Sequence, residues 1–391
     1  MKKRIVLSEP VIVAQGPTWE EVKWGPYQFP GLEMTDDGTI VCTFNSCADS
    51  ETAYGTEQEC YISKDKGETW TKSKLGDYRG QLGIRLPNGE RLSPAGATSI
   101  PMAGLNLPKP IGVNRFNNEV YDLSEISSDI THKNWRFYRT PRDSETPVME
   151  ECELHYPYMT ARSFKGVFVQ PAARGTMHMG SDGTLWLSHY DQCVRNPHTG
   201  GFNPYSATHL MRSTDMGHTW YMVSSHLYHP DTDQDPGAFL REGYDENDIT
   251  FAPDGSILQL IRTGSNSPCF FCRSTDGGKT FSKLQMFDTK GVRPRLLTLK
   301  CGVSLATYGR PGIWLKASDD PCGLEWSAPM ALIAPPEAPN ETMQNISCSY
   351  TYLLEIDDHT AMVAYTDFRI PDEQGVKRKT VLVRKITVWD E

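Results

Sequence analysis

The sequence predicts an all-β fold made of four-stranded antiparallel sheets that repeat along the chain. The first observation is the pattern S-x-D-x-G-x-T followed by Trp or Phe, which occurs three times, at 63–70, 213–220 and 274–281. The second is a turn signal, Asp-Gly or an equivalent pair, that follows an apolar segment six times between residues 37 and 359. The third is the composition: 32 Gly and 27 Pro among 391 residues suit many short strands joined by turns.

Each copy of the repeated pattern is expected to form a hairpin turn. The Asp carboxylate would accept bonds from backbone N–H groups, the Gly would adopt a left-handed conformation, and the aromatic ring would pack beneath the turn. The copies resemble the Asp-box (BNR) repeats of the sialidase superfamily, which implies a β-propeller. Two weaker copies are expected at Ser128-Asp129 with Trp135, and at Ser318-Asp319 with Gly323 and Trp326.

The second turn signal is expected to be a two-residue hairpin between the first two strands of each sheet. It occurs at Asp37-Gly38, Asn88-Gly89, Asp182-Gly183, Asp254-Gly255, Cys301-Gly302 and Asp358-His359. With the Asp-box turn between the third and fourth strands, this order is that of a propeller blade. We therefore predict an all-β, six-bladed β-propeller of four-stranded antiparallel blades, with residues 1–391 forming a single domain.

In chain order, the blades are expected at about 27–78, 79–140, 150–235, 240–288, 290–335 and from 344 onward. Insertions are expected at 101–110 and 195–205, and segment 4–13 is expected to lend a strand that closes the ring. Segment 141–170 has no clear Asp-box but is long enough to contain strands. Seven blades are therefore the alternative.

Composition argues against several partners. The formal net charge is −10 and no Lys/Arg cluster offsets it, so we expect no nucleic-acid partner. No apolar run is long enough for a signal peptide or a membrane span, so we expect no membrane contact, a cytoplasmic location and mostly reduced Cys. The His residues match no compact metal motif, so neither a metal nor a cofactor is expected. Nothing in the sequence indicates an oligomeric state.

Strand direction locates the expected site. If both kinds of turn lie on one face, the first strands begin at the other face, around the central pocket. The position eight residues before the first residue of the turn then faces this pocket. In blades one, three, four, five and six, these residues are Phe29, Arg174, Glu246, Arg293 and Tyr350. The ends of the second strands add Asn45, His189 to Asp191, Arg262, Tyr308 to Arg310, and Tyr365 to Asp367.

Glu246 and Tyr350 are the candidate catalytic pair. Sialidases and related propeller glycosidases carry a Glu at this place and a Tyr at the head of the last blade, and segment 344–350 resembles that Tyr segment. The resemblance implies that the carboxylate takes the phenol proton while the Tyr oxygen attacks the anomeric carbon. The alternative is that Glu246 pairs with an Arg and Tyr350 only lines the tunnel.

Four Arg residues are candidate substrate ligands, because a guanidinium group binds a carboxylate in a bidentate manner. Arg293 and Arg310 are the first choices, with Arg174 and Arg295 in reserve. The alternative for each is an ion pair that holds Glu246 or a neighbouring Asp in place.

The first blade departs from the sialidase pattern. Sialidases begin with [FY]-R-I-P, whereas residues 27–30 read Y-Q-F-P, so Gln28 stands at the place of the Arg. An amide supplies no charge, and true sialidase activity is therefore not the expected function. For the general acid, the resemblance points to the loop at 48–51, with Asp49 as first candidate and Glu51 as second.

His189 and Tyr190 support a different class of enzyme, because propeller polysaccharide lyases use His and Tyr as base and acid. The favoured prediction is a sialidase-superfamily glycoside hydrolase that acts on an oligosaccharide end, with an acidic sugar as one option. A lyase acting on a uronate-containing glycan and a non-catalytic glycan-binding propeller are the alternatives.

Overall fold

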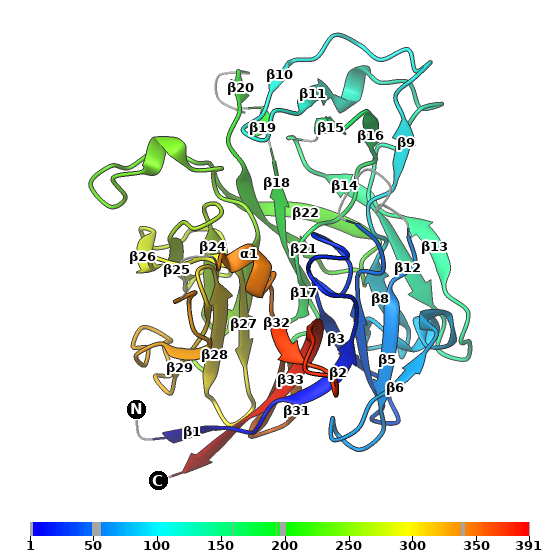
Figure 1. Ribbon diagram of the computed structural model, residues 1–391. Coiled ribbons are helices and arrows are strands. Elements are labelled where there is room, and N and C mark those ends of the chain that lie inside the picture. Colours follow the sequence, from blue (N-terminus) through cyan, green and yellow to red (C-terminus); the bar gives the residue numbers. More distant parts are fainter. Residues whose placement is uncertain are drawn as a thin grey trace.

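The computed structural model describes residues 3–48, 56–158, 160–192, 194–195, 201–337 and 341–390 (Figure 1). These residues form an all-β structure in which antiparallel sheets follow one another along the chain. The first sheet is β3 (Gly31–Met34), β4 (Ile40–Phe44), β5 (Glu59–Ser63) and β6 (Thr71–Ser73). The second is β7 (Ile84–Arg85), β8 (Arg91–Pro94), β12 (Arg136–Thr140) and β13 (Val148–Glu151).

The third sheet has a parallel strand at its outer edge. Its strands are β17 (Met177–Met179), β18 (Leu185–Asp191), β21 (Ala207–Ser213), β22 (Thr219–His226) and the added β14 (Glu153–His155). The fourth is β23 (Asn247–Phe251), β24 (Ile257–Arg262), β25 (Cys269–Ser274) and β26 (Gln285–Asp288). The fifth is β27 (Val292–Thr298), β28 (Ser304–Gly309), β29 (Ile313–Ser318) and β30 (Met330–Ile333).

The sixth sheet joins the two ends of the described chain. It contains β31 (Tyr352–Asp357), β32 (Thr360–Pro371) and β33 (Lys377–Asp390), and both β1 (Lys3–Leu7) and β2 (Val11–Gln15) pair with β33. The expectation that segment 4–13 lends a strand to the last sheet is thus confirmed. Short helical segments stand between strands: α1 (Met343–Ile346) and the 3₁₀ turns Leu75–Asp77, Arg79–Gln81, Leu123–Glu125 and Ala238–Leu240.

An inserted sheet lies beside the second and third sheets (Figure 1). It combines β9 (Ser99–Pro101), β10 (Gly112–Val113) and β11 (Glu119–Asp122) with β15 (Thr160–Phe164) and β16 (Val167–Val169). A two-stranded ribbon, β19 (Val194–Arg195) and β20 (Phe202–Asn203), stands nearby. Segment 141–170 does hold strands, but they are divided among three sheets: β13 joins the second, β14 the third, and β15 and β16 the inserted one.

The six turn signals all connect the first and second strands of a sheet. The expected two-residue loop is wrong at the five described turns that contain Gly. Thr35 N–H, for example, bonds to Thr39 O at 3.0 Å and Gly38 N–H to Thr35 O at 3.1 Å, so the loop has three residues. Gly38 has a φ of 84°, which makes this a type I turn followed by a bulge. The Asp358-His359 turn keeps two residues.

The Asp-box turns contain the expected hydrogen bonds. In the copy at 213–220, Asp215 Oδ1 accepts from Thr219 N–H at 2.9 Å, and Gly217 N–H donates to Ser213 Oγ at 2.9 Å. Trp220 Nε1 donates to Gly217 O at 3.1 Å, which places the indole beneath the turn. The copies at 63–70 and 274–281 repeat the Asp and Gly bonds.

The two weaker copies have different outcomes. At 318–326 the turn forms, but Asp320 accepts the bond from Leu324 N–H at 2.8 Å, whereas Asp319 was expected to do so. The segment at 128–135 is not such a turn. It precedes β12, the third strand of its sheet, whereas the true copies connect the third and fourth strands.

Apolar side chains fill the spaces between consecutive sheets. One cluster joins the second and third sheets and stacks Phe137 on Trp220 with ring centroids 5.5 Å apart. Similar clusters join the fifth sheet to the sixth and the sixth to the first. A cavity of about 710 Å³ is lined by residues of the first strands β3, β7, β17, β23, β27 and β31. The first strands of all six sheets therefore face one central space. None of the described helices is long and apolar enough to cross a bilayer.

Candidate active site

A second cavity, of about 700 Å³, lies where the first strands begin, at the end opposite the hairpin turns. This volume is in the usual range for small-molecule sites. The sequence placed five residues at this end, and all five line the cavity: Phe29, Arg174, Glu246, Arg293 and Tyr350. A fixed spacing to the turn was sufficient to locate them, because each strand rises by a constant amount per residue. We call this space the substrate cavity.

Glu246 and Tyr350 are in direct contact. The Tyr350 hydroxyl donates a hydrogen bond to Glu246 Oε1 at 2.6 Å. The second carboxylate oxygen accepts a bond from Arg262 Nη1, also at 2.6 Å, and the same Nη1 lies 3.1 Å from the Tyr350 oxygen. Arg262 stands at the end of β24, and its Nη2 bonds to Glu242 at 3.0 Å. The guanidinium group thus holds the carboxylate beside the phenol.

The charges around this pair fix its protonation. Burial alone would raise the pKa of Glu246, but the guanidinium groups of Arg262 and Arg293 and the Tyr350 hydrogen bond hold this pKa below its ordinary value. Burial and the negative charge of Glu246 raise the pKa of Tyr350 well above its ordinary value. At neutral pH the site therefore presents a carboxylate that accepts a hydrogen bond from a neutral phenol.

Arg293 and Arg295 have different surroundings. Arg293 lines the substrate cavity, and its charge acts on Glu246, Tyr190 and Tyr350. Arg295 lies deeper and lines both large cavities. Its Nη1 is 3.8 Å from Asp248, and its guanidinium stands 4.4 Å from the centre of the Tyr352 ring. The contacts of Arg295 therefore match the alternative given for it in the sequence analysis, an ion pair with a neighbouring Asp.

Arg310 and Gln28 are not among the residues that line the substrate cavity, so their assignment as substrate ligands stays a prediction. Arg310 Nη2 bonds to Cys348 O at 2.8 Å, and its guanidinium stands 5.6 Å from the Trp24 ring. Gln28 is fully buried, and its Oε1 accepts a bond from Gly25 N–H at 2.9 Å. The neighbouring Phe29 has a φ of 58° and takes the cavity-facing place, with its ring 4.8 Å from that of Tyr350.

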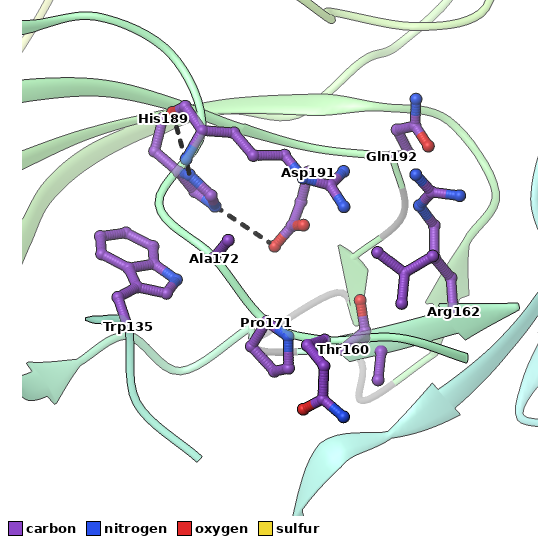
Figure 2. A pocket seen from close by; sticks show the side chains of 12 residues that line it. Trp135, Thr160, Arg162, Pro171, Ala172, His189, Asp191 and Gln192 are labelled. Atoms are coloured by element: carbon purple, nitrogen blue, oxygen red, sulfur yellow. Dashed lines mark hydrogen bonds and ion pairs between the residues drawn. The ribbon is translucent and has the colours of Figure 1, made fainter. Parts of the chain in front are cut away.

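His189 and Tyr190 point to different places. Tyr190 lines the substrate cavity, whereas His189 is buried behind it, with its ring centroid 4.4 Å from that of Trp135 (Figure 2). His189 Nε2 lies 3.6 Å from Asp191 Oδ2. Successive strand residues face opposite sides, so of the two side chains only Tyr190 faces the substrate cavity. The observed placement therefore argues against their assigned lyase roles.

The expected general acid, Asp49, lies outside the described residues, as does Glu51. Among the described residues, no three His, Cys, Asp or Glu side chains gather in a way that could hold a metal ion. The absence of a metal or cofactor remains a prediction.

The sequence did not single out several residues of the site. The sequence placed Arg262 at the end of a second strand, but its bond to Glu246 depends on the pairing of β23 with β24. Asp245 is buried beside Glu246, and burial raises its pKa to about 7 despite the charge of Arg262. The only hint of Asp245 in the sequence was its place directly before Glu246, at the start of a strand. The inserted sheet brings four more residues to the lining, without any sequence signal: Phe116, Asn118, Arg162 and Phe164.

Comparison with known proteins gives a fold but no family. Neither a protein-family model nor a curated protein matches the chain. Among solved structures, a protein of unknown function from Dyadobacter fermentans is similar with a TM-score of 0.66 and 18% identity, over 98% of this chain and 99% of that one. An α-L-arabinanase of Penicillium chrysogenum, complexed with arabinobiose, is similar with a TM-score of 0.54 and 17% identity, over 97% and 98%.

Sialidases are also among the similar structures. A NanB sialidase variant from Streptococcus pneumoniae aligns with a TM-score of 0.48 and 13% identity, over 96% of this chain and 70% of that one. At these identities the comparisons describe architecture only. The chain thus has an all-β fold similar to that of the arabinanase.

Proposed function

We propose that this protein is a glycoside hydrolase with a six-bladed propeller as its single domain, and that it removes a sugar from the end of an oligosaccharide. The hydrogen bond of 2.6 Å between the Tyr350 hydroxyl and Glu246, at the wall of a cavity of about 700 Å³, is the observation that carries this proposal. The propeller is supported by the apolar clusters between consecutive sheets and by the pairing of β1 and β2 with β33.

In the proposed first step, the Tyr350 oxygen attacks the anomeric carbon while its proton passes to Glu246. The bond from the anomeric carbon to the glycosidic oxygen breaks, and the departing oxygen takes a proton from a general acid, for which Asp49 remains the candidate. In the second step, water attacks the anomeric carbon as the bond to Tyr350 breaks, and the water gives a proton to the general acid. The phenol regains its proton from Glu246.

The two guanidinium groups near the pair both support the proposed proton transfer. Arg262 binds the far oxygen of Glu246, leaves Oε1 to accept the phenol proton, and stands 3.1 Å from the Tyr350 oxygen. Its charge and that of Arg293, which faces the cavity, favour the phenolate that develops as the proton leaves. Because a neutral nucleophile avoids repulsion by a nearby carboxylate, an acidic sugar is a suitable substrate.

The surroundings of the cavity support an exo mode of action. Its lining comes from the sheets and, on one side, from Phe116, Asn118 and Phe164 of the inserted segment. A space bounded in this way suits one end of a glycan better than the middle of a long chain. Aromatic rings in the lining offer faces for the apolar side of a sugar.

The test is an assay of the full-length protein on a glycan panel that includes uronides, arabinosides, sialosides and neutral hexosides. We expect a new reducing end, and no ultraviolet-absorbing unsaturated uronate. A fluorinated glycosyl fluoride of the preferred sugar should leave a covalent adduct on Tyr350, detectable by peptide mass spectrometry. An unsaturated product would establish a lyase, and binding without any product would establish a glycan-binding propeller; either result overturns the proposal.

A further inference from the structure

A small polar cavity lies directly behind the substrate cavity. It has a volume of about 20 Å³, enough for roughly one water molecule. Three side chains line both cavities and so form the wall between them: Arg162, Arg174 and Gln192. Figure 2 shows Asp191 extending into the small cavity, with His189 on one side and Arg162 on the other.

Asp191 is held in place by two neighbours. The Tyr156 hydroxyl donates to its Oδ2 at 2.9 Å, and His189 Nε2 lies 3.6 Å from the same oxygen. The backbone N–H of Arg174 donates to His189 Nδ1 at 3.2 Å, so His189 links the Asp191 carboxylate to the start of the third sheet. Burial opposes the charge on Asp191, but His189 and Arg174 outweigh it and hold its pKa below the ordinary value.

Arg174 comes from a different sheet than either member of the reacting pair. Glu246, Arg262 and Arg293 are the charged groups with the largest effect on Tyr350, whereas Arg174 acts on Asp191, and also on Tyr190 and Asp245. Arg174 precedes β17 in the third sheet, and Arg162 comes from β15 of the inserted sheet. The lining of the substrate cavity therefore includes two guanidinium groups besides those of Arg293 and Arg295, in a protein whose formal net charge is −10.

We propose that Arg162 and Arg174 form an anion subsite of the substrate cavity, and that Asp191 is the positioning residue that holds Arg174 from behind. The subsite receives a carboxylate or sulfate group of a glycan at a position separate from the Tyr350–Glu246 pair. A guanidinium group fixed by a carboxylate behind it keeps its donors directed at a ligand in front. This inference rests on the proposed function for the identity of the ligand as a glycan, but not for the presence of the subsite.

The experiment measures phenylglyoxal modification of individual Arg residues in the full-length protein by peptide mass spectrometry. Sodium sulfate and D-glucuronate serve as anion probes, and D-glucose serves as the neutral probe. We expect both anions, or one of them, to slow modification of Arg174 by about tenfold, because a bound anion occupies the guanidinium N–H groups and blocks the reagent. Glucose should have no effect, and the exposed Arg212 on β21 is the internal control. Protection by only one anion identifies the group that the subsite prefers.

Asp191→Asn tests the positioning role. It should abolish the protection of Arg174 and raise KM for an anionic glycoside about tenfold with kcat unchanged, while KM for its neutral counterpart stays constant. Asp358→Asn, at an exposed hairpin, is the matched control. If Asp191→Asn does not fold, as judged by thermal unfolding, Arg174→Met should remove binding of the same anions in calorimetry.

The outcomes separate this inference from the proposed function. Protection of Arg174 without hydrolysis of any glycoside supports the subsite and refutes the hydrolase. Hydrolysis with equal modification rates in sulfate, glucuronate and glucose refutes the subsite alone. An Arg174 that does not react in the wild-type protein also refutes it, because the guanidinium would not be accessible from the cavity.

Discussion

The Tyr350 hydroxyl and the Glu246 carboxylate are joined by a hydrogen bond of 2.6 Å although the residues are 104 positions apart. They head the first strands of the sixth and fourth sheets, with the fifth sheet between them. Two side chains from non-adjacent sheets can meet only because the first strands converge on one space. The pair would act as one unit in the proposed chemistry.

Loss of either member should therefore remove nearly all turnover. Tyr350→Phe and Glu246→Gln should each lower kcat by about 10²–10⁴-fold, the usual range for groups that transfer a proton at the reacting centre. The double variant should be scarcely slower than either single one, because the two groups serve one step. Steady-state kinetics on the preferred glycoside measures this, with the exposed Tyr221→Phe as control. Losses that multiply would show independent roles.

Replacement of Arg262 should change the pH dependence. Arg262 is the main group that lowers the pKa of Glu246 against the effect of burial, so Arg262→Met should raise this pKa. The carboxylate is needed as base, and activity is lost as pH falls through its pKa. The acidic limb of the kcat/KM profile should then move to higher pH. Arg262→Lys should move the acidic limb less than Arg262→Met does. If the acidic limb does not move, it reports the titration of a group other than Glu246.

The same substitution should reduce stability, because it leaves a buried carboxylate without its partner. We expect Arg262→Met to lower the free energy of unfolding by about 3–5 kcal/mol, the usual range for breaking a buried pair. Denaturant unfolding measures this. Arg273→Met breaks the pair with Asp254 at the fourth hairpin and is the matched control, for which we expect a smaller loss.

Two buried histidines should make the protein sensitive to acid. Burial lowers the pKa of His209 to about 3 and that of His226 to about 4, from an ordinary value of 6.5. Below pH 6.5 the unfolded chain binds protons that the folded protein excludes, so stability falls as pH decreases from 6.5 toward 4. The slope should approach about 1.4 kcal/mol per pH unit for each residue.

Thermal unfolding between neutral pH and pH 5 would measure this effect. His209→Gln should flatten the decline, since glutamine cannot bind the proton, although it also loses the contact with Ser225 Oγ at 2.5 Å. The exposed His359→Gln should leave the slope unchanged. A slope that is the same in all three proteins would refute the assignment.

The Asp-box carboxylates should contribute to stability and not to chemistry. Asp215→Ala removes the bonds from Thr219 N–H and Ser213 Oγ, and should lower the free energy of unfolding by about 1–3 kcal/mol with kcat unchanged in the folded fraction. Asp129→Ala, in the segment that proved not to be such a turn, should have almost no effect. An Asp215→Ala protein of full stability without turnover would contradict this reading.

Gln28→Arg should not create sialidase activity. The side chain is fully buried and bonded to Gly25 N–H, so an Arg here would place a charge in the interior and not in the substrate cavity. We expect a less stable protein without cleavage of a sialoside reporter, measured by thermal unfolding and fluorescence. Phe29→Arg, which does face the cavity, is the informative comparison. Sialoside cleavage by the Gln28→Arg protein would refute this placement.

Local features were predictable from the sequence. The turn residues Asp, Gly and Thr specify hairpins through bonds within five residues, so the three copies with the full pattern could be read directly from the sequence. Strand length then placed Glu246 and Tyr350 at the cavity end, since position along an extended chain follows from counting residues. The size of the hairpin loop was less certain, because a bulge adds one residue without changing the sequence signal.

The tertiary structure decided which side chains meet. Counting along a strand predicts the end at which a residue lies but not its partner, so the bond from Arg262 to Glu246 and the burial of His189 against Trp135 were not available from sequence. Gln28 was assigned from the sialidase motif alone, and only the structure shows its side chain fully buried with Oε1 bonded to Gly25 N–H. The inserted sheet joins segments 99–122 and 160–169 by strand pairing, which depends on contacts between distant residues. Such contacts are fixed only when all the sheets pack together.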